Sequence, residues 1–341
     1  MDKNILLISP NFFDYAQKIS KGLEYKGYKV DWYDDRPSAN SIVKAIIRIN
    51  KNFINFYIKR YFEKIYKKIK DKQYLKVILV SGQSLSLSRE MIIKIKECQP
   101  NAEFVLYQWD SLKNFKYIEG FKDLFDRAYS FDNDDVNENA YLKFLPLFYT
   151  NEYKKIGESG VKEFKYDFLF VGTAHPKKYF YVKKMSEMLR ERFDKQYVYF
   201  FFPSIIVYIY RKIFNKEFKD ARIKEFNFKP VSNDELMDLI KNSKCILDSA
   251  QENQVGLTIR VIEAVGAKRK LITTNKDVVN YNFYCPENIY IYDGEFDFSN
   301  VFFNKEYKEL NEKIYNQYSI DVWLDVLLGQ ENNYENFSYR C

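Results

Sequence analysis

The chain has 341 residues, of which 46% are hydrophobic and 30% are charged, and its net charge is +7. At roughly 150 residues per domain, this length predicts two domains. The positive charge suits an anionic substrate or an anionic membrane surface, but it is small for a nucleic-acid-binding protein. No nucleic-acid motif is present either, so we expect no nucleic-acid partner.

Four cysteines lie far apart in the sequence without CxxC spacing: Cys98, Cys245, Cys285 and Cys341. They predict reduced thiols in a cytoplasmic protein rather than disulfides or a zinc site. No run of 18 apolar residues is present, which argues against a transmembrane helix. The apolar residues 5–8 form too short a run for a signal peptide.

The chain begins with a predicted βαβ unit. A strand over Asn4–Ser9, a helix over Phe12–Lys26 and a strand over Tyr28–Tyr33 predict a doubly wound domain covering residues 1–150. The first turn, Ser9-Pro10-Asn11, lacks the GxGxxG fingerprint, which argues against a nicotinamide or flavin dehydrogenase.

Two segments predict basic amphipathic helices, residues 42–70 and residues 204–218. Such a helix can lie on an anionic membrane surface. It can equally pack its apolar stripe on a sheet and expose its lysines to water. Both interpretations stay open for both segments.

Asp110 follows a predicted strand over Glu103–Gln108. Polar residues just past the carboxyl end of a parallel strand stand where such sheets bind ligands, so Asp110 is the candidate base of this half. It could instead cap the helix that follows.

A polar stretch over residues 151–165 predicts a linker, and residues 166–318 predict a second domain. Its first strand, Tyr166–Val171, leads into Gly172, Thr173 and His175, the single histidine of the chain. His175 is either structural or a group that hydrogen-bonds a phosphate or a sugar hydroxyl. A helix over residues 319–329 is expected to return to the first domain, and residues 330–341 predict a disordered tail.

The segment from Cys245 to Asn275 predicts a second βαβ unit with a polar loop before its helix. Gly256 precedes the helix, whose N-terminal N–H groups can bind an anion. Arg260 adds a positive charge in the first turn, and Glu263 is a hydrogen-bond acceptor one turn later. The pattern suits a nucleoside diphosphate, but an ordinary crossover with a glycine turn fits it as well.

Several segments resemble the bacterial capsule and lipopolysaccharide glycosyltransferases related to the CgeB-like group. They are residues 107–114, 129–135, 168–175, 254–275 and 281–293. The resemblance implies an α/β protein with the GT-B fold, in which two Rossmann-like domains face each other across a cleft. It implies a nucleoside diphosphate sugar as donor, a glycan or lipid-linked glycan as acceptor, and no cofactor or metal.

The resemblance also implies roles for individual residues. Catalysis would fall to Asp110 and His175, and a nearby lysine would assist the leaving group. The nucleotide sugar would be bound by Gly172, Thr173, Gln254, Gly256, Leu257, Thr258, Arg260 and Glu263. Arg260 would neutralise the diphosphate and Glu263 would accept from the ribose. Val255 stands where many retaining enzymes of this fold carry a glutamate, so the stereochemical outcome stays open.

The expected function is glycosyl transfer in bacterial surface polysaccharide synthesis. We expect a cytoplasmic protein that can also lie at the inner face of the membrane. Two alternatives stay open: a transferase of sugar-phosphate or polyol-phosphate units, and a non-catalytic nucleotide-sugar-binding scaffold at the membrane.

Overall fold

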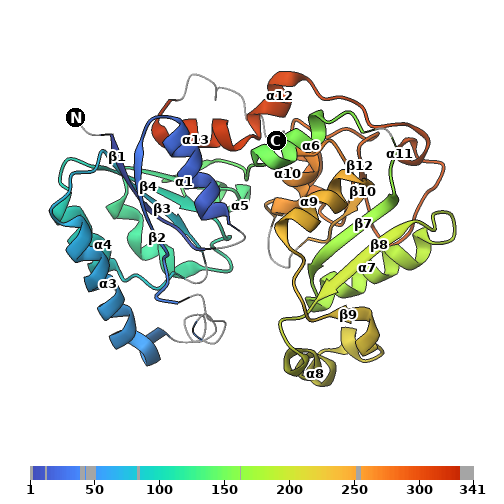
Figure 1. The fold of residues 1–341 in the computed structure, drawn as a ribbon, viewed down its shortest axis with the longest axis horizontal. Helices are drawn as coiled ribbons and strands as arrows, with labels where there is room; N and C mark the ends of the chain where they lie inside the picture. The colour runs from blue at the N-terminus through green and yellow to red at the C-terminus, as the bar shows by residue number, and fades with distance from the viewer. Residues whose placement is uncertain are drawn as a thin grey trace. The chain divides into compact units, whose positions relative to one another are not determined.

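The computed structural model describes residues 3–11, 14–38, 43, 51–82, 85–161, 163–250 and 255–330. The chain forms two compact units (Figure 1). The first unit runs to Pro146 and also includes Gly256 and the segment that begins at Ile320. The second unit begins at Leu147 and holds Leu257–Ser319.

The first unit contains a six-stranded parallel sheet in the order β2-β1-β3-β4-β5-β6. Its strands are β1 (Asn4–Ile8), β2 (Lys29–Tyr33), β3 (Lys76–Ser81), β4 (Glu103–Gln108), β5 (Arg127–Ser130) and β6 (Leu142–Phe144). Their near-continuous apolar runs are typical of parallel strands that are covered on both faces.

Helices cover both faces of this sheet. They are α1 (Tyr15–Tyr25), α3 (Asn55–Ile69), α4 (Arg89–Cys98), α5 (Asn133–Glu138) and α13 (Ile320–Leu328), with 3-10 segments η1 (Lys51–Ile54) and η2 (Lys116–Leu124). Helices α3 and α4 pack with Leu6, Leu79 and Leu106 in one core cluster. Because side chains alternate along a strand, Tyr107 points to the other face, where its ring meets Trp323 of α13 at 4.8 Å between centroids.

Helix α3 belongs to the basic segment over residues 42–70, for which a membrane surface and packing on the sheet were both open. Residue 42 and residues 44–50 lie outside the described part of the chain. From Ile58 onward, the apolar stripe is buried in the core cluster: Ile58, Phe62, Ile65 and Ile69. Their spacing of three and four residues places them on one helical face, so this stripe is core rather than a free surface.

The second unit has a six-stranded parallel sheet in the order β12-β11-β10-β7-β8-β9. Its strands are β7 (Tyr166–Thr173), β8 (Gln196–Phe201), β9 (Phe226–Asn227), β10 (Ser243–Leu247), β11 (Lys270–Thr273) and β12 (Ile289–Ile291). Counted from β7, the spatial order is 3-2-1-4-5-6, the order of dinucleotide-binding folds. It reverses between β7 and β10, and ligands bind such sheets at this switch point.

Helix α7 (Pro176–Leu189) packs on one face of the second sheet through Val182 and Met185. Helices α6 (Asn151–Glu158), α9 (Asn233–Lys241) and α10 (Ile259–Gly266) pack together on the other face. Shorter elements complete the unit: α8 (Ile205–Phe214), η3 (Lys216–Phe218), η4 (Ile223–Glu225), η5 (Lys276–Asn280), α11 (Val301–Asn304) and α12 (Glu312–Gln317).

The stretch predicted as a linker, residues 151–165, contains α6. Tyr153 and Ile156 of this helix are buried. Two apolar positions three residues apart are too few to show a helical period in the sequence, which is why the helix was missed. The prediction of an α/β protein with two parallel sheets is confirmed. The predicted tail from residue 331 onward lies outside the described residues.

Candidate functional site

Two helices begin at the switch point of the second sheet. Strand β7 ends at Thr173, and His175 occupies the N-cap position of α7. Strand β10 ends at Leu247, and Thr258 occupies the N-cap position of α10. Since β7 and β10 are neighbours and parallel, both helix N-termini follow the same edge of the sheet and present their partial positive charge there.

Asp248 is a buried acid that forms hydrogen bonds with several elements at this edge. It is only 2% exposed, and its two carboxylate oxygens accept hydrogen bonds from the hydroxyls of Thr258 and Thr273, both at 3.1 Å. Its own N–H donates to the carbonyl of Ile272 at 2.8 Å. Asp248 therefore links the start of α10 to β10 and β11.

Arg260 lies in the first turn of α10. Its Nη1 is 3.1 Å from Oε2 of Glu263, and its Nη2 donates to the carbonyl of Val171 at 3.4 Å. Glu263 is only 4% exposed and also hydrogen-bonds the hydroxyl of Tyr153. Burial and the charge of Glu263 raise the pKa of Tyr153 well above its ordinary value, so this phenol stays protonated at neutral pH.

Lys178, the third residue of α7, brings a second cation to the same place. Burial lowers the pKa of its ammonium group, the charge of Arg260 lowers it further, and the charge of Asp248 opposes both effects. Lys178 lies in the first turn of α7 and Arg260 in the first turn of α10, so both cations stand at the same sheet edge. A bound anion would relieve the repulsion between the two cations, so the arrangement suits a diphosphate group.

The other predicted residues of the second unit lie around this edge. Gly172 and Thr173 end β7, and the side chain of His175 is exposed at the start of α7. A Cβ atom at Gly172 would stand 2.9 Å from the ring of Phe170, so a larger residue would disturb the strand end. Leu257 is 2% exposed, which leaves its backbone rather than its side chain for binding.

Gly256 belongs by its contacts to the first unit. Its N–H donates to Oδ2 of Asp132 at 3.2 Å, and a Cβ atom on Gly256 would stand 2.7 Å from the ring of Phe131. The predicted diphosphate donor is thus bonded to a carboxylate in this structure. Gln254 lies outside the described residues.

Asp110, the candidate base, stands at the carboxyl edge of the first sheet. A Cβ atom at Gly82 would lie 2.8 Å from Oδ2 of Asp110, so the glycine after β3 makes room for this carboxylate. The interpretation of Asp110 as a helix cap is wrong, because the next helical segment, η2, begins at Lys116 and follows Phe115.

Asp135 is a second acid at the edge of the first sheet. It is fully buried and accepts hydrogen bonds from the N–H of Leu112 and the hydroxyls of Ser111 and Ser130. Burial, with a smaller contribution from Asp132, raises the pKa of Asp135 to about 6. Asp135 was not predicted as a site residue, because an acid in a short helix is usually exposed.

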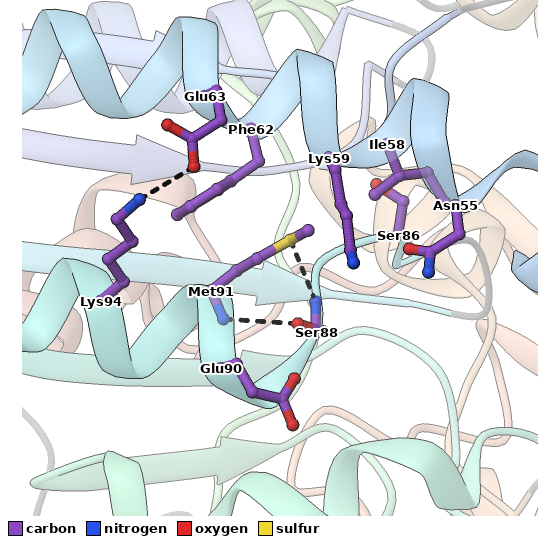
Figure 2. Close-up of a pocket in the computed structure, with 10 residues that line it drawn as sticks. All are labelled: Asn55, Ile58, Lys59, Phe62, Glu63, Ser86, Ser88, Glu90, Met91 and Lys94. Carbon is purple, nitrogen blue, oxygen red and sulfur yellow. Dashed lines mark hydrogen bonds and ion pairs between the residues drawn. The ribbon is translucent and has the colours of Figure 1, made fainter.

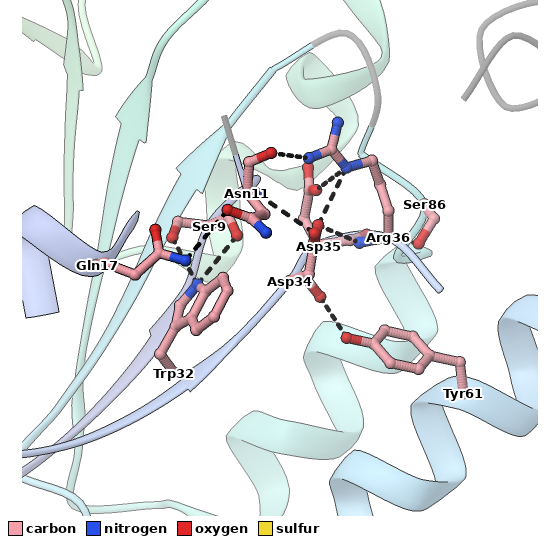
Figure 3. A network of polar contacts seen from close by, with 9 residues as sticks. All are labelled: Ser9, Asn11, Gln17, Trp32, Asp34, Asp35, Arg36, Tyr61 and Ser86. Carbon is pink, nitrogen blue, oxygen red and sulfur yellow. Dashed lines mark hydrogen bonds and ion pairs between the residues drawn. The ribbon is translucent and has the colours of Figure 1, made fainter. Parts of the chain in front are cut away.

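A polar network fixes the loops that follow β1 and β2 (Figure 3). The buried guanidinium of Arg36 pairs with Asp34 at 3.0 Å and Asp35 at 3.1 Å. Tyr61 donates to the carbonyl of Asp34 at 2.8 Å, and Ser86 to that of Asp35 at 2.6 Å. Because these groups bind one another, the network is structural.

A surface groove of about 560 Å³ lies between α3 and α4 (Figure 2). Its lining residues are Asn55, Ile58, Lys59, Phe62, Glu63, Ser86, Ser88, Glu90, Met91 and Lys94, and Lys94 pairs with Glu63 at 2.8 Å. The groove contains none of the predicted site residues. Within the described part of the chain, no group of three or more His, Cys, Asp or Glu residues could hold a metal ion.

The site residues predicted from the sequence do not include Asp248, Lys178 or Tyr153. Two of them could have been found from their position just past a predicted strand, since Asp248 directly follows β10 and Lys178 lies in the first turn of the helix after β7. Tyr153 could not have been found in this way, because the contact between α6 and α10 joins residues that are far apart in the sequence.

Comparison with known proteins found no matching family model and no matching curated protein. Solved structures are similar over nearly the whole chain. A glycosyltransferase from Rickettsia africae gives a TM-score of 0.58 at 13% identity, covering 98% of this chain and 99% of its own. The lipopolysaccharide outer core galactosyltransferase WaaB gives 0.50 at 11% identity, covering 96% and 98%.

The UDP-GlcNAc 2-epimerase from Neisseria meningitidis, solved with bound UDP-GlcNAc, gives a TM-score of 0.51 at 9% identity. It covers 96% of this chain and 99% of its own. At these identities the similarities establish the fold, which is GT-B, and confirm that prediction.

Proposed function

We propose that this protein transfers a sugar from a nucleoside diphosphate sugar to a glycan or lipid-linked glycan. One observation carries the proposal: Lys178 and Arg260 lie in the first turns of two helices that begin at the switch point of the second sheet. Cations and helix N-termini stabilise the charge that develops on a departing diphosphate without a metal ion.

On the donor side, Arg260 and Lys178 bind the diphosphate, with the backbone of Leu257 and Thr258 and the hydroxyl of Thr173 beside it. One oxygen of Glu263 accepts from the ribose while the other holds Arg260. A carboxylate offers about four lone-pair sites, so both contacts are compatible. Gly172, Gln254 and Gly256 complete the proposed nucleotide-sugar site.

In the transfer step, the oxygen of an acceptor hydroxyl forms a bond with the anomeric carbon of the donor sugar. The bond from that carbon to the diphosphate oxygen breaks, and the nucleoside diphosphate leaves with the electron pair. For an inverting reaction, Asp110 takes the hydroxyl proton as general base. His175, exposed at the start of α7, is the second proposed catalytic group.

Similar solved structures support this proposal over its alternatives. Two of them are glycosyltransferases, one acting in the lipopolysaccharide outer core, and the epimerase structure holds a nucleotide sugar. They favour a nucleotide-sugar ligand and support a role in bacterial surface polysaccharide synthesis. A sugar-phosphate or polyol-phosphate transferase, or a non-catalytic scaffold, would keep the ligand site but differ in the reaction.

The proposed location is the cytoplasm, with peripheral contact at the inner face of the membrane, where a lipid-linked acceptor would be held. Cys98, Cys245 and Cys285 are free thiols, which suits a reducing compartment. Within the described residues, no helix is long and apolar enough to span a bilayer.

A nucleotide screen tests the proposal. The full-length protein is heated with each common nucleoside diphosphate, and the stabilising ones are then supplied as sugar conjugates without acceptor. We expect stabilisation by one nucleoside diphosphate and slow hydrolysis of its conjugate. Stabilisation without hydrolysis would favour the scaffold, and conversion to an epimer would favour an epimerase. No stabilisation by any nucleotide would overturn the proposal.

A further inference from the structure

Helix α8 exposes a face of large apolar side chains. Ile206 is 74% exposed, Ile213 68% and Phe214 67%. The face also includes Ile205, Ile209 and Tyr210, each about half exposed. A soluble surface rarely carries so many adjacent large apolar residues without a partner.

The opposite side of α8 explains why this face points outward. Tyr208 is the one buried residue of the helix, and its hydroxyl donates to the carbonyl of Ala221 at 3.1 Å. Its ring packs against Phe202 and Phe226 in the core of the second unit. The hydroxyl of Ser204 accepts a hydrogen bond from the N–H of Val207 and caps the helix. The cap at Ser204 and the packing of Tyr208 together fix the orientation of α8.

Basic residues are frequent in and after α8. Residues 203–229 contain seven Lys or Arg and three Asp or Glu, a net charge of +4. One of the three acids, Glu225, pairs with Lys183 at 2.8 Å. Six of the cations are exposed: Lys212, Lys216, Lys219, Arg222, Lys224 and Lys229. The segment therefore combines exposed apolar side chains with exposed cations.

We propose that α8 docks this protein on the surface of a bilayer that contains anionic lipid. The apolar side chains enter the boundary between headgroups and acyl chains, and the exposed cations bind the headgroups. A second copy of the chain is the weaker occupant, because a symmetric contact through α8 would bring two segments of net positive charge together. This inference does not rest on the proposed catalysis.

The location of α8 fits this role. Helix α8 follows the carboxyl end of β8, so it stands at the same edge of the second sheet as the candidate nucleotide site (Figure 1). The first unit offers a contrast, since the stripe of α3 from Ile58 to Ile69 is buried. Phe56 at the start of α3 is 80% exposed and provides a matched control outside α8.

Sedimentation with vesicles tests the inference on the full-length protein. Vesicles of phosphatidylcholine with about 30% phosphatidylglycerol, an anionic lipid, are compared with vesicles of pure phosphatidylcholine at low and high salt. We expect binding to the anionic vesicles that weakens as salt screens the cations. The triple variant I206S/I213S/F214S should bind at least tenfold more weakly, as should K216S/K219S/K224S, while F56S should bind like the wild type.

The changed side chains are exposed, so all variants should keep the wild-type circular dichroism spectrum and nucleotide-binding affinity. Absence of vesicle binding, or equal binding by the wild type and the triple variant, would overturn the inference. Equal binding to neutral vesicles would contradict the role of the cations. A dimer in solution that the triple variant abolishes, without vesicle binding, would assign the face to a second copy instead.

Discussion

Nη1 of Arg260 lies 3.1 Å from Oε2 of Glu263, three residues further along α10. The sequence suggested two separate contacts, one with a diphosphate and one with a ribose. The structure joins the two side chains, so the carboxylate holds the guanidinium in place. Because Glu263 is buried and also bonded to Tyr153, the pair is anchored to α6 as well as to α10.

Replacing Arg260 with Ala should weaken the binding of both a nucleoside diphosphate and inorganic pyrophosphate by about 10- to 100-fold, because both ligands carry the charge that Arg260 neutralises. Calorimetric titration measures both affinities. Arg190→Ala is the control, since this exposed arginine follows the far end of α7. Unchanged pyrophosphate affinity in R260A would remove Arg260 from the diphosphate site.

Replacing Glu263 with Gln separates its two proposed contacts. If Glu263 accepts from a ribose, E263Q should weaken nucleotide binding by about tenfold and pyrophosphate binding much less, because only the nucleotide carries a ribose. An equal loss for both ligands would show that Glu263 acts only by positioning Arg260. The same titrations decide between these outcomes.

Lys178 should make nucleotide affinity depend on pH. Its pKa is lowered by burial and by Arg260, so the ammonium group loses its proton at a lower pH than an ordinary lysine. Diphosphate affinity should therefore fall as the pH rises through that lowered pKa. In K178R the fall should be smaller, because a guanidinium stays charged, and K178M should bind weakly throughout. A fall of equal size in the wild type and K178R would argue against this role.

Asp135 should make the stability of the first unit depend on pH. Its pKa rises from 3.8 to about 6 on folding, so between these values the folded state holds a proton that the unfolded state has lost. The free energy of unfolding should fall by about 1 to 3 kcal/mol as the pH rises through this window. Asp135→Asn cannot titrate and should flatten that part of the curve. Urea unfolding at pH 4 to 7 measures both proteins, and parallel curves would refute the assignment.

Strands and several helices could be predicted closely from the sequence. Strand β4 has the predicted bounds, because a short apolar run determines it locally. The grouping of Thr173, His175 and Arg260 at one sheet edge was also predictable. It follows from the rule that parallel strands place their carboxyl ends at one edge.

The remaining features depend on contacts between distant residues. A Cβ atom on Gly266 would stand 2.3 Å from the ring of Tyr149, so the small size of this glycine allows a close approach that the sequence does not reveal. The proximity of Lys178 to Arg260 follows from the pairing of β7 with β10. The sequence also left open whether α8 lies in the core or at the surface. Only the structure shows that Tyr208 is its buried residue, so the apolar face of α8 points outward.

Transfer itself is the most direct test of the central claim. The full-length protein is incubated with the stabilising nucleotide's sugar conjugates, labelled in the sugar, and with a glycan and lipid extract from cells that make the protein. Mass spectrometry then follows the label. We expect the label on an acceptor together with one equivalent of nucleoside diphosphate, and we expect R260A to abolish most of this transfer. Nucleotide binding with no label on any acceptor and no nucleoside diphosphate released would contradict the central claim.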